Sequence, residues 1–284
     1  MIKKDNIMSK EIKQIGIVGS GYMGKQIAAR SILYGYNVNL YDINKDSLEE
    51  AKSFVNKLTR REKEKRKNIT YLTDLKKACS NSDLVIEAIP EDLLLKRRIF
   101  SRLEKFSPPH AILASNSSSI PISKIENAVE RKDKLLNIHF YSPIPKINMA
   151  DLMKGTMTDE GIYERAKQWL ESIEVEPLIL KKKSFGFLFN RIWHVVKKEA
   201  LKIWAEGIAD IEEVDKAWKI FTGMPYGAFF MMDNVGLDVV YDIEMSYYKE
   251  SGDLKDKPPA KLREMVESGE LGLKSGKGFY KYRR

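Results

Sequence analysis

Residues 14–27 read QIGIVGSGYMGKQI and include the closely spaced glycines Gly19, Gly21 and Gly24. Their spacing fits two phosphate-binding patterns. In the pattern G-x-G-x-x-G, the three glycines form the turn of a dinucleotide-binding βαβ unit. In the pattern G-x-x-x-x-G-K, Gly19, Gly24 and Lys25 begin a P-loop. The two patterns imply different chemistry, so the neighbouring residues must distinguish them.

The residue after the lysine argues against the P-loop. A P-loop needs Ser or Thr there, because that hydroxyl coordinates Mg²⁺, and this chain has Gln26. A dinucleotide site needs a strand before the glycines, a helix after them and an acid about 20 residues further on. Residues 14–18 form a short apolar run, Tyr22–Tyr34 has apolar residues at helical spacing, and Asp42 closes a second strand. These features predict a Rossmann-type nucleotide-binding fold.

Each residue of the glycine turn has a physical role in this interpretation. Gly19 permits the tight turn, Gly21 lets the backbone approach a pyrophosphate at the helix N-terminus, and Gly24 allows close packing of helix on sheet. Asp42 would accept hydrogen bonds from the ribose hydroxyls and repel a 2′-phosphate, which favours NAD over NADP. Lys45 nearby leaves that preference open.

The chain then divides into two patterns. Apolar runs at Asn37–Tyr41, Leu84–Ile89, Ala111–Ala114 and Leu135–Phe140 alternate with helical stretches. This alternation predicts an α/β domain with a parallel, doubly wound sheet over residues 12–183.

Residues 184–284 have a different pattern, which predicts an all-α domain after a hinge at Lys181–Gly186. The expected helices are Phe187–Gly207, Ile211–Phe221, Pro225–Val235, Leu237–Ser251 and Pro259–Glu267. Their amphipathic faces include Trp193, Trp204, Trp218, Phe229 and Phe230, part of which must be core. Residues 1–11 are expected to form a flexible tail.

Composition excludes several classes of protein. Hydrophobic residues make up 43% and charged residues 31%, as in ordinary globular domains, and no apolar stretch approaches the roughly 20 residues of a membrane span. The N-terminal MIKKDNIMSK lacks the apolar core of a signal peptide. The single Cys79 excludes an internal disulfide and fits a reducing cytoplasm.

The net charge of +9 raises the possibility of nucleic-acid binding. The densest basic run, residues 59–67, is interrupted by Glu62 and Glu64 and has no aromatic residues for base stacking. We interpret it as a solvated helix end, with attraction of a polyanionic small ligand as the alternative. Binding to nucleic acid is not expected.

Hydride transfer from an alcohol carbon needs a proton acceptor, commonly His, and the chain has three. His110 precedes a predicted strand, which places it at the opposite edge of the sheet from the cofactor. His194 lies inside a long helix and is interpreted as a packing or capping residue. His139 lies at the carboxyl end of its strand, where ligands of such sheets bind. Residues 115–120, SNSSSI, begin at the same edge, where a hydroxyl could donate to a substrate oxygen.

Eight segments of the chain share a family pattern. In order they are GSGYMG at 19–24, DLVIEAIPEDLLLK at 83–96, SNSSSI at 115–120, HFYSPIP at 139–145, GFLFNR at 186–191, GMPYG at 223–227, DNVGLDV at 233–239 and GLKSGKGFYKY at 272–282. With these segments the chain resembles the L-3-hydroxyacyl-CoA dehydrogenase family, which includes 3-hydroxybutyryl-CoA dehydrogenases, over about residues 12–282.

The resemblance implies an NAD-dependent oxidoreductase of fatty acid metabolism that interconverts L-3-hydroxyacyl-CoA, short-chain in this case, and 3-ketoacyl-CoA. It implies that His139 is the general base and that Ser118 and Asn190 hold the substrate oxygen. It also implies a homodimer formed through the C-terminal helices, without a metal. The cofactor-binding positions carried over are Gly19, Gly21, Tyr22, Met23, Gly24, Asp42, Ala88, Glu91, Lys96, Asn116, Ser118, Ser142 and Lys274.

The chain departs from the family pattern at specific positions. Family members pair the base with a Glu that orients the imidazole, and that position is Asp151 here. Its side chain is one methylene shorter, so we expect the strands to lie slightly closer if Asp151 serves this role. Ser142 stands where the family usually has Asn, and Phe185 replaces a customary Pro.

A larger departure lies between the two predicted strands that end near Asp42 and begin at Leu84. Family members have a longer helical projection there, which helps to grip CoA. In this chain Arg60, Arg61 or Lys65 remain to contact CoA phosphates, or the substrate carries no CoA.

Two alternative functions therefore stay open. The stretch PEDLLLKRRIF at 90–100 also resembles L-gulonate 3-dehydrogenases, which act on free hydroxy acids. The departures at Asp151 and Ser142 keep a non-catalytic NAD-binding protein as the other alternative.

Overall fold

The computed structural model describes residues 11–144, 146–182 and 184–282. The chain divides into two compact units, the first ending at Leu188 and the second beginning at Phe189. The predicted tail, apart from its last residue, and one residue of the predicted hinge lie outside the described residues. No helix in the described part is both long and apolar enough to cross a membrane.

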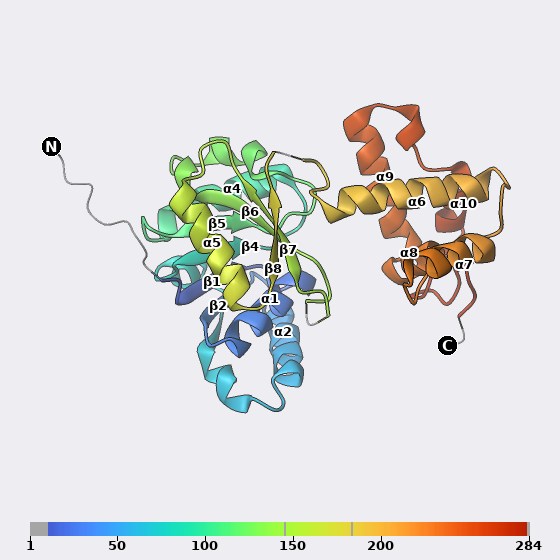
Figure 1. Cartoon of the computed structure of the whole chain (residues 1–284). Helices are drawn as coiled ribbons and strands as arrows, with labels where there is room; N and C mark the ends of the chain where they lie inside the picture. Colours follow the sequence, from blue (N-terminus) through green and yellow to red (C-terminus); the bar gives the residue numbers. More distant parts are fainter. Residues whose placement is uncertain (1–10, 145, 183, 283–284) are drawn as a thin grey trace. The chain divides into compact units, whose positions relative to one another are not determined.

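The first unit is built around one eight-stranded sheet, in the order β3-β2-β1-β4-β5-β6-β7-β8 (Figure 1). Its strands are β1 Gln14–Val18, β2 Asn37–Tyr41, β3 Ile69–Leu72, β4 Leu84–Glu87, β5 Ile112–Ser115, β6 Leu135–Phe140, β7 Met149–Lys154 and β8 Glu176–Leu180. Neighbouring strands are parallel except β6 and β7, which are antiparallel. The predicted doubly wound, mostly parallel sheet is confirmed, although the prediction does not include β3, β7 and β8.

Helices cover both faces of the sheet. They are α1 Tyr22–Leu33, α2 Lys45–Leu58, α3 Leu75–Cys79, α4 Leu93–Phe106 and α5 Glu160–Ser172. Successive strand residues point to opposite faces, so β4 buries Ile86 in the core with α1, α2 and α5, and Val85 in the core with α3 and α4. Burial on both faces explains why these strands read as continuous apolar runs.

The same alternation orients the end of β6. Ile138 and Phe140 belong to the core shared with α1 and α5, so His139 between them points to the other face. On that face the Asn137 side chain accepts a hydrogen bond from the Ile122 backbone N–H at 2.6 Å. The segment that follows β5 is thereby held against the face that carries His139.

The second unit is helical, as predicted. Its helices are α6 Phe189–Ala205, α7 Ile211–Thr222, α8 Ala228–Val235, α9 Leu237–Ser251 and α10 Ala260–Glu267. The helix expected from Phe187 begins later because Phe187 has a φ of 53°, which is outside the helical range. The core of this unit includes Leu201, Phe229 and Met232, so Phe229 is a packing residue.

His194 lies inside this second unit, in an ion-pair cluster between α6 and α9. Its Nδ1 is 2.6 Å from Glu244 Oε2, and Lys197 Nζ is 2.5 Å from Glu244 Oε1. The ring of Tyr247 stacks on the imidazole with centroids 3.8 Å apart. Burying three ionisable groups is tolerated because each faces an opposite or hydrogen-bonding partner. These contacts agree with the interpretation of His194 as a packing residue.

Candidate active site

The glycine turn lies between β1 and α1, at the carboxyl edge of the sheet. Gly19 has a φ of 104°, and a Cβ there would lie 2.5 Å from the Ala88 carbonyl oxygen. Both the backbone conformation and the close approach therefore require glycine at this position. A Cβ on Gly24 would lie 1.8 Å from the Gly19 carbonyl oxygen, which shows how closely α1 packs on the turn. A Cβ on Gly21 would meet no protein atom within 4 Å. The backbone at Gly21 therefore faces open space.

The geometry around this turn fits NAD. Gly21 is the N-cap of α1, no side chain caps this end, and the first turn holds no acidic residue, so its N–H groups suit a pyrophosphate. Asp42 Oδ2 accepts hydrogen bonds from the Ser20 N–H and hydroxyl at 2.8 and 3.0 Å, and Oδ1 accepts from the Asn44 N–H at 2.9 Å. These bonds hold the carboxylate beside the turn and leave it capacity to accept from ribose hydroxyls.

We expect alanine at Gly21 and at Gly24 to have separable effects. The Cβ of Gly21→Ala fills space that a pyrophosphate would occupy, so the Kd for NAD rises about tenfold or more and the melting temperature stays unchanged. The Cβ of Gly24→Ala meets backbone, which costs about 1–3 kcal/mol of folding free energy and lowers the melting temperature. Calorimetric NAD titration and thermal unfolding measure the two effects. Equal thermal losses in both variants would contradict these roles.

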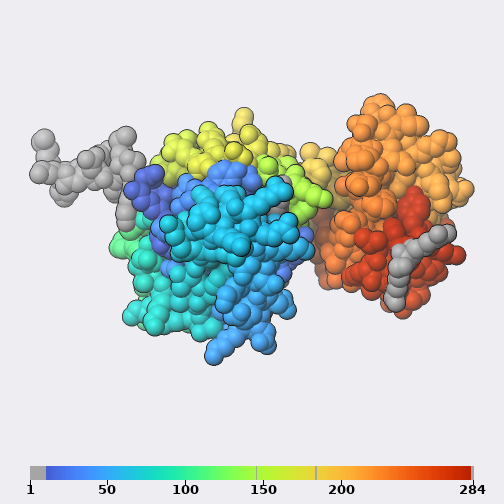
Figure 2. Space-filling view, turned by 90° about the horizontal axis from the view of Figure 1, so that it is seen from below, coloured from blue at the N-terminus to red at the C-terminus, as the bar shows by residue number. Residues whose placement is uncertain are grey.

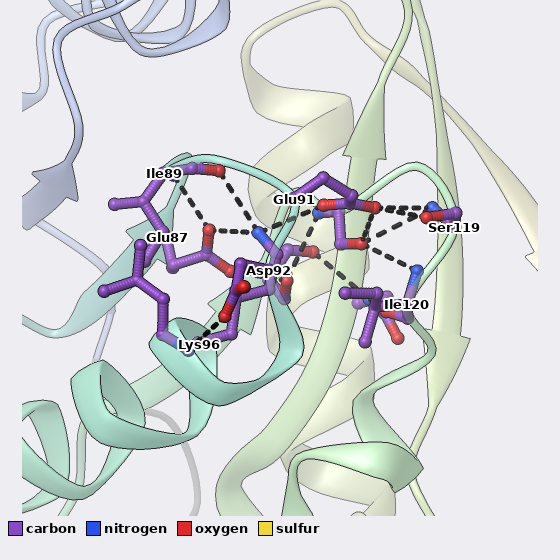
Figure 3. Close-up of polar contacts among 11 residues, drawn as sticks. Glu87, Ile89, Glu91, Asp92, Lys96, Ser119 and Ile120 are labelled. Carbon is purple, nitrogen blue, oxygen red and sulfur yellow. Dashed lines mark hydrogen bonds and ion pairs between the residues drawn. The ribbon is translucent and has the colours of Figure 1, made fainter. Parts of the chain in front are cut away.

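Lys96 is buried at the centre of a polar cluster that lies next to the turn and extends from buried Glu87 to the more exposed Glu91 (Figure 3). Its Nζ is 2.6 Å from Glu87 Oε1 and 3.2 Å from Glu91 Oε2. Glu87 also accepts from the Ser115 hydroxyl at 2.7 Å, and Glu91 accepts from the Ser119 N–H at 2.9 Å. Burial raises the pKa of Glu91, but the Lys96 ammonium and the serine donors outweigh it and leave that pKa below its usual range.

This cluster holds the loop after β5 in place. The sequence interpretation carried Lys96 and Glu91 over as cofactor contacts but missed Glu87, a fully buried carboxylate at the end of β4. Glu87 within the run DLVIEAI at 83–89 was the available signal, because a carboxylate in an apolar strand is costly to bury unless it has a partner. Lys96 is itself only 1% exposed, so its first role is to neutralise Glu87.

The predicted base is bonded to its predicted partner. In the antiparallel β6–β7 pair, His139 lies directly opposite Asp151, and His139 Nδ1 is 3.0 Å from Asp151 Oδ2. The carboxylate is acceptor-only, so Nδ1 carries the hydrogen and Nε2 is left as the basic nitrogen. Phe187 stacks on the imidazole with ring centroids 5.1 Å apart. Ordinary strand pairing is sufficient for this bond, despite the shorter aspartate.

Other candidate residues take their places around the same edge. Asn116 Oδ1 accepts from the Phe140 N–H at 2.9 Å, which joins the loop after β5 to the end of β6. Ser118 lies exposed in that loop, and Ser142 is half-buried in the segment after β6. Gln26, the residue that argues against a P-loop, accepts from the Ile144 N–H at 3.0 Å and so ties α1 to this segment.

The remaining candidate site residues, one catalytic and three cofactor-binding, lie near the turn or in the second unit. Tyr22 is exposed and Met23 half-buried in the first turn of α1. Asn190 lies at the start of α6. Lys274 Nζ is 2.5 Å from Asp238 Oδ1, and this hydrogen-bonded pairing holds the pKa of the Asp238 carboxyl below its usual value. Both Asn190 and Lys274 belong to the second unit.

His110 marks the opposite edge of the sheet. It lies just before β5, and its Nε2 is 3.0 Å from Asp83 Oδ1, just before β4. Asp83 Oδ2 accepts from the backbone N–H groups of Lys13 and Gln14, at the start of β1. The first unit thus has two His–Asp pairs at opposite ends of its strands, and only the His139 pair lies at the edge of the glycine turn.

A nucleotide turn and a buried His–Asp pair at the carboxyl edge of a mostly parallel sheet are the features of an NAD-dependent dehydrogenase. Residues 14–183 match the NAD binding domain of 3-hydroxyacyl-CoA dehydrogenase, and residues 186–282 match its C-terminal domain. The chain therefore belongs to the 3-hydroxyacyl-CoA dehydrogenase family, and the predicted family, fold and NAD cofactor are confirmed.

Individual relatives are similar over nearly the whole chain. Human mitochondrial hydroxyacyl-coenzyme A dehydrogenase is 31% identical, covering 96% of this chain and 92% of its own. A 3-hydroxybutyryl-CoA dehydrogenase of Mycobacterium tuberculosis is 34% identical, with 97% and 100% covered. Among solved structures, M. tuberculosis FadB2 superimposes with a TM-score of 0.90 at 32% identity, and a diketoreductase with 0.87 at 34%, each covering 96% of this chain and 100% of the other.

Proposed function

We propose that the protein oxidises a short-chain L-3-hydroxyacyl-CoA to the 3-ketoacyl-CoA, and catalyses the reverse reduction, with His139 as the acid–base group. The observation that carries the proposal is the 3.0 Å hydrogen bond between His139 Nδ1 and Asp151, at the edge of the sheet that holds the glycine turn. This bond fixes the tautomer in which Nε2 accepts the proton of the 3-hydroxyl.

The charges of the pair suit both directions of the reaction. Bound NAD would supply the hydride acceptor for the substrate C3, and the chain's own residues handle the proton. As His139 takes that proton it becomes an imidazolium, which the buried Asp151 carboxylate stabilises at short range. In the reverse direction the imidazolium returns the proton to the carbonyl oxygen. Asp151 is fully buried, so water screens this interaction little.

Polar donors are needed where charge develops on the substrate oxygen. We assign this role to the Ser118 hydroxyl and the Asn190 amide. The support for Ser118 is its exposed position in the loop after β5, which the Glu87–Lys96–Glu91 cluster and Asn116 hold in place. Asn190 is assigned from the family pattern alone.

The connection between α2 and β3 is short, so we expect its contact with CoA to be small. After α2 the chain turns directly into a 3₁₀ segment, Lys63–Asn68, on the surface that is light blue to cyan in Figure 2. Arg66 donates to the Asn56 carbonyl and to the Thr59 hydroxyl and so is structural. Arg60 and Arg61 are exposed, and we assign them to the CoA phosphates.

A second candidate function is reduction or oxidation of a substrate without CoA. The observation that favours it is the similarity to the diketoreductase, whose reported substrates are dicarbonyl compounds. The short connection between α2 and β3 agrees with this alternative too, since it offers little surface for CoA.

Matched substrates distinguish the two functions. We expect kcat/KM with acetoacetyl-CoA and NADH to exceed that with free acetoacetate by about 10²-fold or more, because binding of the CoA moiety lowers the free energy of the transition state. L-Gulonate with NAD should be turned over more slowly still. A higher kcat/KM with either free acid than with acetoacetyl-CoA would favour the second candidate function, a substrate without CoA. Tight NAD binding without turnover of any of these substrates would support a non-catalytic protein.

We also propose that the protein acts in the cytoplasm, in fatty acid metabolism, as a homodimer. The support for a dimer is the apolar surface of the second unit, where Ile220 and Phe221 are 76% and 93% exposed. The support for the other two assignments is the family membership and the single, buried Cys79.

A further inference from the structure

Tyr141 contacts the same carboxylate oxygen as the catalytic candidate His139. The Tyr141 hydroxyl donates to Asp151 Oδ2 at 2.5 Å, and His139 Nδ1 lies 3.0 Å from that oxygen. All three residues are buried: Tyr141 is 8% exposed, His139 6% and Asp151 0%. One buried oxygen therefore accepts two hydrogen bonds from side chains that are two residues apart in sequence.

Strand geometry produces this arrangement. His139 and Tyr141 are two residues apart, so alternation along the strand places both on the same face of the sheet. The β6–β7 register then brings Asp151 opposite His139, within reach of Tyr141 on the diagonal. The Tyr141 ring packs edge-on against the imidazole, with centroids 4.7 Å apart at 67°. The hydroxyl is thus aimed at Asp151 by the same ring that packs on His139.

The other oxygen of the Asp151 carboxylate has no donor among the described residues, so the carboxylate depends on the donors to Oδ2, one of which is Tyr141. Asp151 Oδ1 is buried and accepts no hydrogen bond from the described residues. A fully buried carboxylate stays ionised only if donors replace its lost water, and here Tyr141 and His139 are the donors. When His139 gives up its extra proton at the end of ketone reduction, the positive charge beside the carboxylate is lost, and the Tyr141 hydroxyl and the neutral Nδ1–H remain as the two donors that hold the anion.

We propose that Tyr141 is a positioning residue of the dehydrogenase, whose hydroxyl keeps the Asp151 carboxylate ionised and fixed against His139 Nδ1. This inference rests on the proposed function, in which His139 is the acid–base group. Tyr141 acts through Asp151 and does not itself exchange a proton with the substrate.

The sign of its electrostatic effect follows from the charges. With neutral His139 the pair carries one negative charge, and with the imidazolium it carries none. The hydroxyl stabilises the more negative form, so its removal makes the pair bind a proton more tightly. Among the described residues, the titratable groups hydrogen-bonded to Asp151 are His139 from β6 and Tyr141 just beyond it. On β8, Leu178 lies opposite Asp151, and Phe187 stacks on the imidazole.

Tyr141→Phe removes the hydroxyl and keeps the ring that packs on His139. We expect the rise of kcat/KM for alcohol oxidation with pH to move to higher pH by about one unit. Activity well below the midpoint then falls about tenfold, whereas the high-pH plateau and the Kd for NAD change much less. Tyr141→Leu lacks both ring and hydroxyl and should move the midpoint in the same direction.

Histidine NMR tests the same shift without any substrate. The chain has only three histidines, so His139→Gln identifies the ring signal of His139, and its titration midpoint should move upward in Tyr141→Phe. Tyr163→Phe is the matched control, because this buried tyrosine donates instead to the Leu152 carbonyl on the adjacent position of β7. It should leave the titration of His139 and the pH profile unchanged.

The two readouts separate failure of the inference from failure of the proposed function. An unchanged His139 titration in both Tyr141 variants, or a lower plateau with an unmoved midpoint, would overturn the positioning role. A shifted titration in a protein that turns over no 3-hydroxy substrate would retain the role of Tyr141 in the pair and reject the proposed reaction.

Discussion

His139→Gln should lower kcat for alcohol oxidation by about 10²–10⁴-fold while the Kd for NAD stays near that of the unchanged protein. Glutamine has a similar size and can still accept a hydrogen bond, but it cannot take a proton at neutral pH. The hydroxyl proton must then pass to water, in a site where the imidazole is only 6% exposed. The glycine turn does not depend on this side chain, so cofactor binding is retained.

His110→Gln is the control for this substitution. It removes an imidazole that is likewise bonded to an aspartate, but at the opposite edge of the sheet. We expect kcat within about twofold of the unchanged protein. Steady-state rates and NAD titration on both variants give the comparison. Full activity in His139→Gln, or an equal loss in His110→Gln, would remove His139 from the mechanism.

Asp151→Asn should have the second largest effect, a loss in kcat of about 10²–10³-fold. The asparagine oxygen can still accept from His139 Nδ1 and from the Tyr141 hydroxyl, so the geometry is kept. What is lost is the negative charge that stabilises the imidazolium during oxidation. A neutral amide also makes the imidazole bind its proton less tightly, so the midpoint of the pH–rate profile moves to lower pH. This shift is opposite to the one expected for Tyr141→Phe.

The pH–rate profile of Asp151→Asn therefore measures charge rather than packing. Asp83→Asn is its counterpart in the other His–Asp pair, and activity per folded molecule should be close to normal there, since that carboxylate holds backbone N–H groups at the start of β1. If Asp151→Asn keeps its rate, or if its midpoint does not move, the carboxylate has no electrostatic role in the reaction.

Much of the first unit follows from local sequence. The run 14–18, the glycines after it and Asp42 predict β1, the turn and α1, because each feature acts within a few residues of its own position. The strands that the prediction does not include are of another kind. β3 and β8 are the two outermost strands of the sheet. β8 also includes Pro177, a residue that weakens a strand pattern. Edge strands are identified mainly by the neighbour that they pair with.

The candidate site shows the same division. The position of His139 at the carboxyl end of an apolar strand was predictable, and the family pattern pointed to Asp151. The involvement of Tyr141 and of Glu87 was not predicted. Tyr141 reaches Asp151 only through the β6–β7 register, and Glu87 is neutralised by Lys96 from the following helix.

The sequence by itself determined the class of fold, the nucleotide turn and the family, since these depend on glycine conformation, apolar periodicity and ordered motifs. Only the tertiary structure decided which side chains share a carboxylate and which buried charges neutralise one another. Such contacts join residues between nine and 28 positions apart. They are set by strand register and by the cost of burying an unpaired charge, and neither can be read from one segment alone.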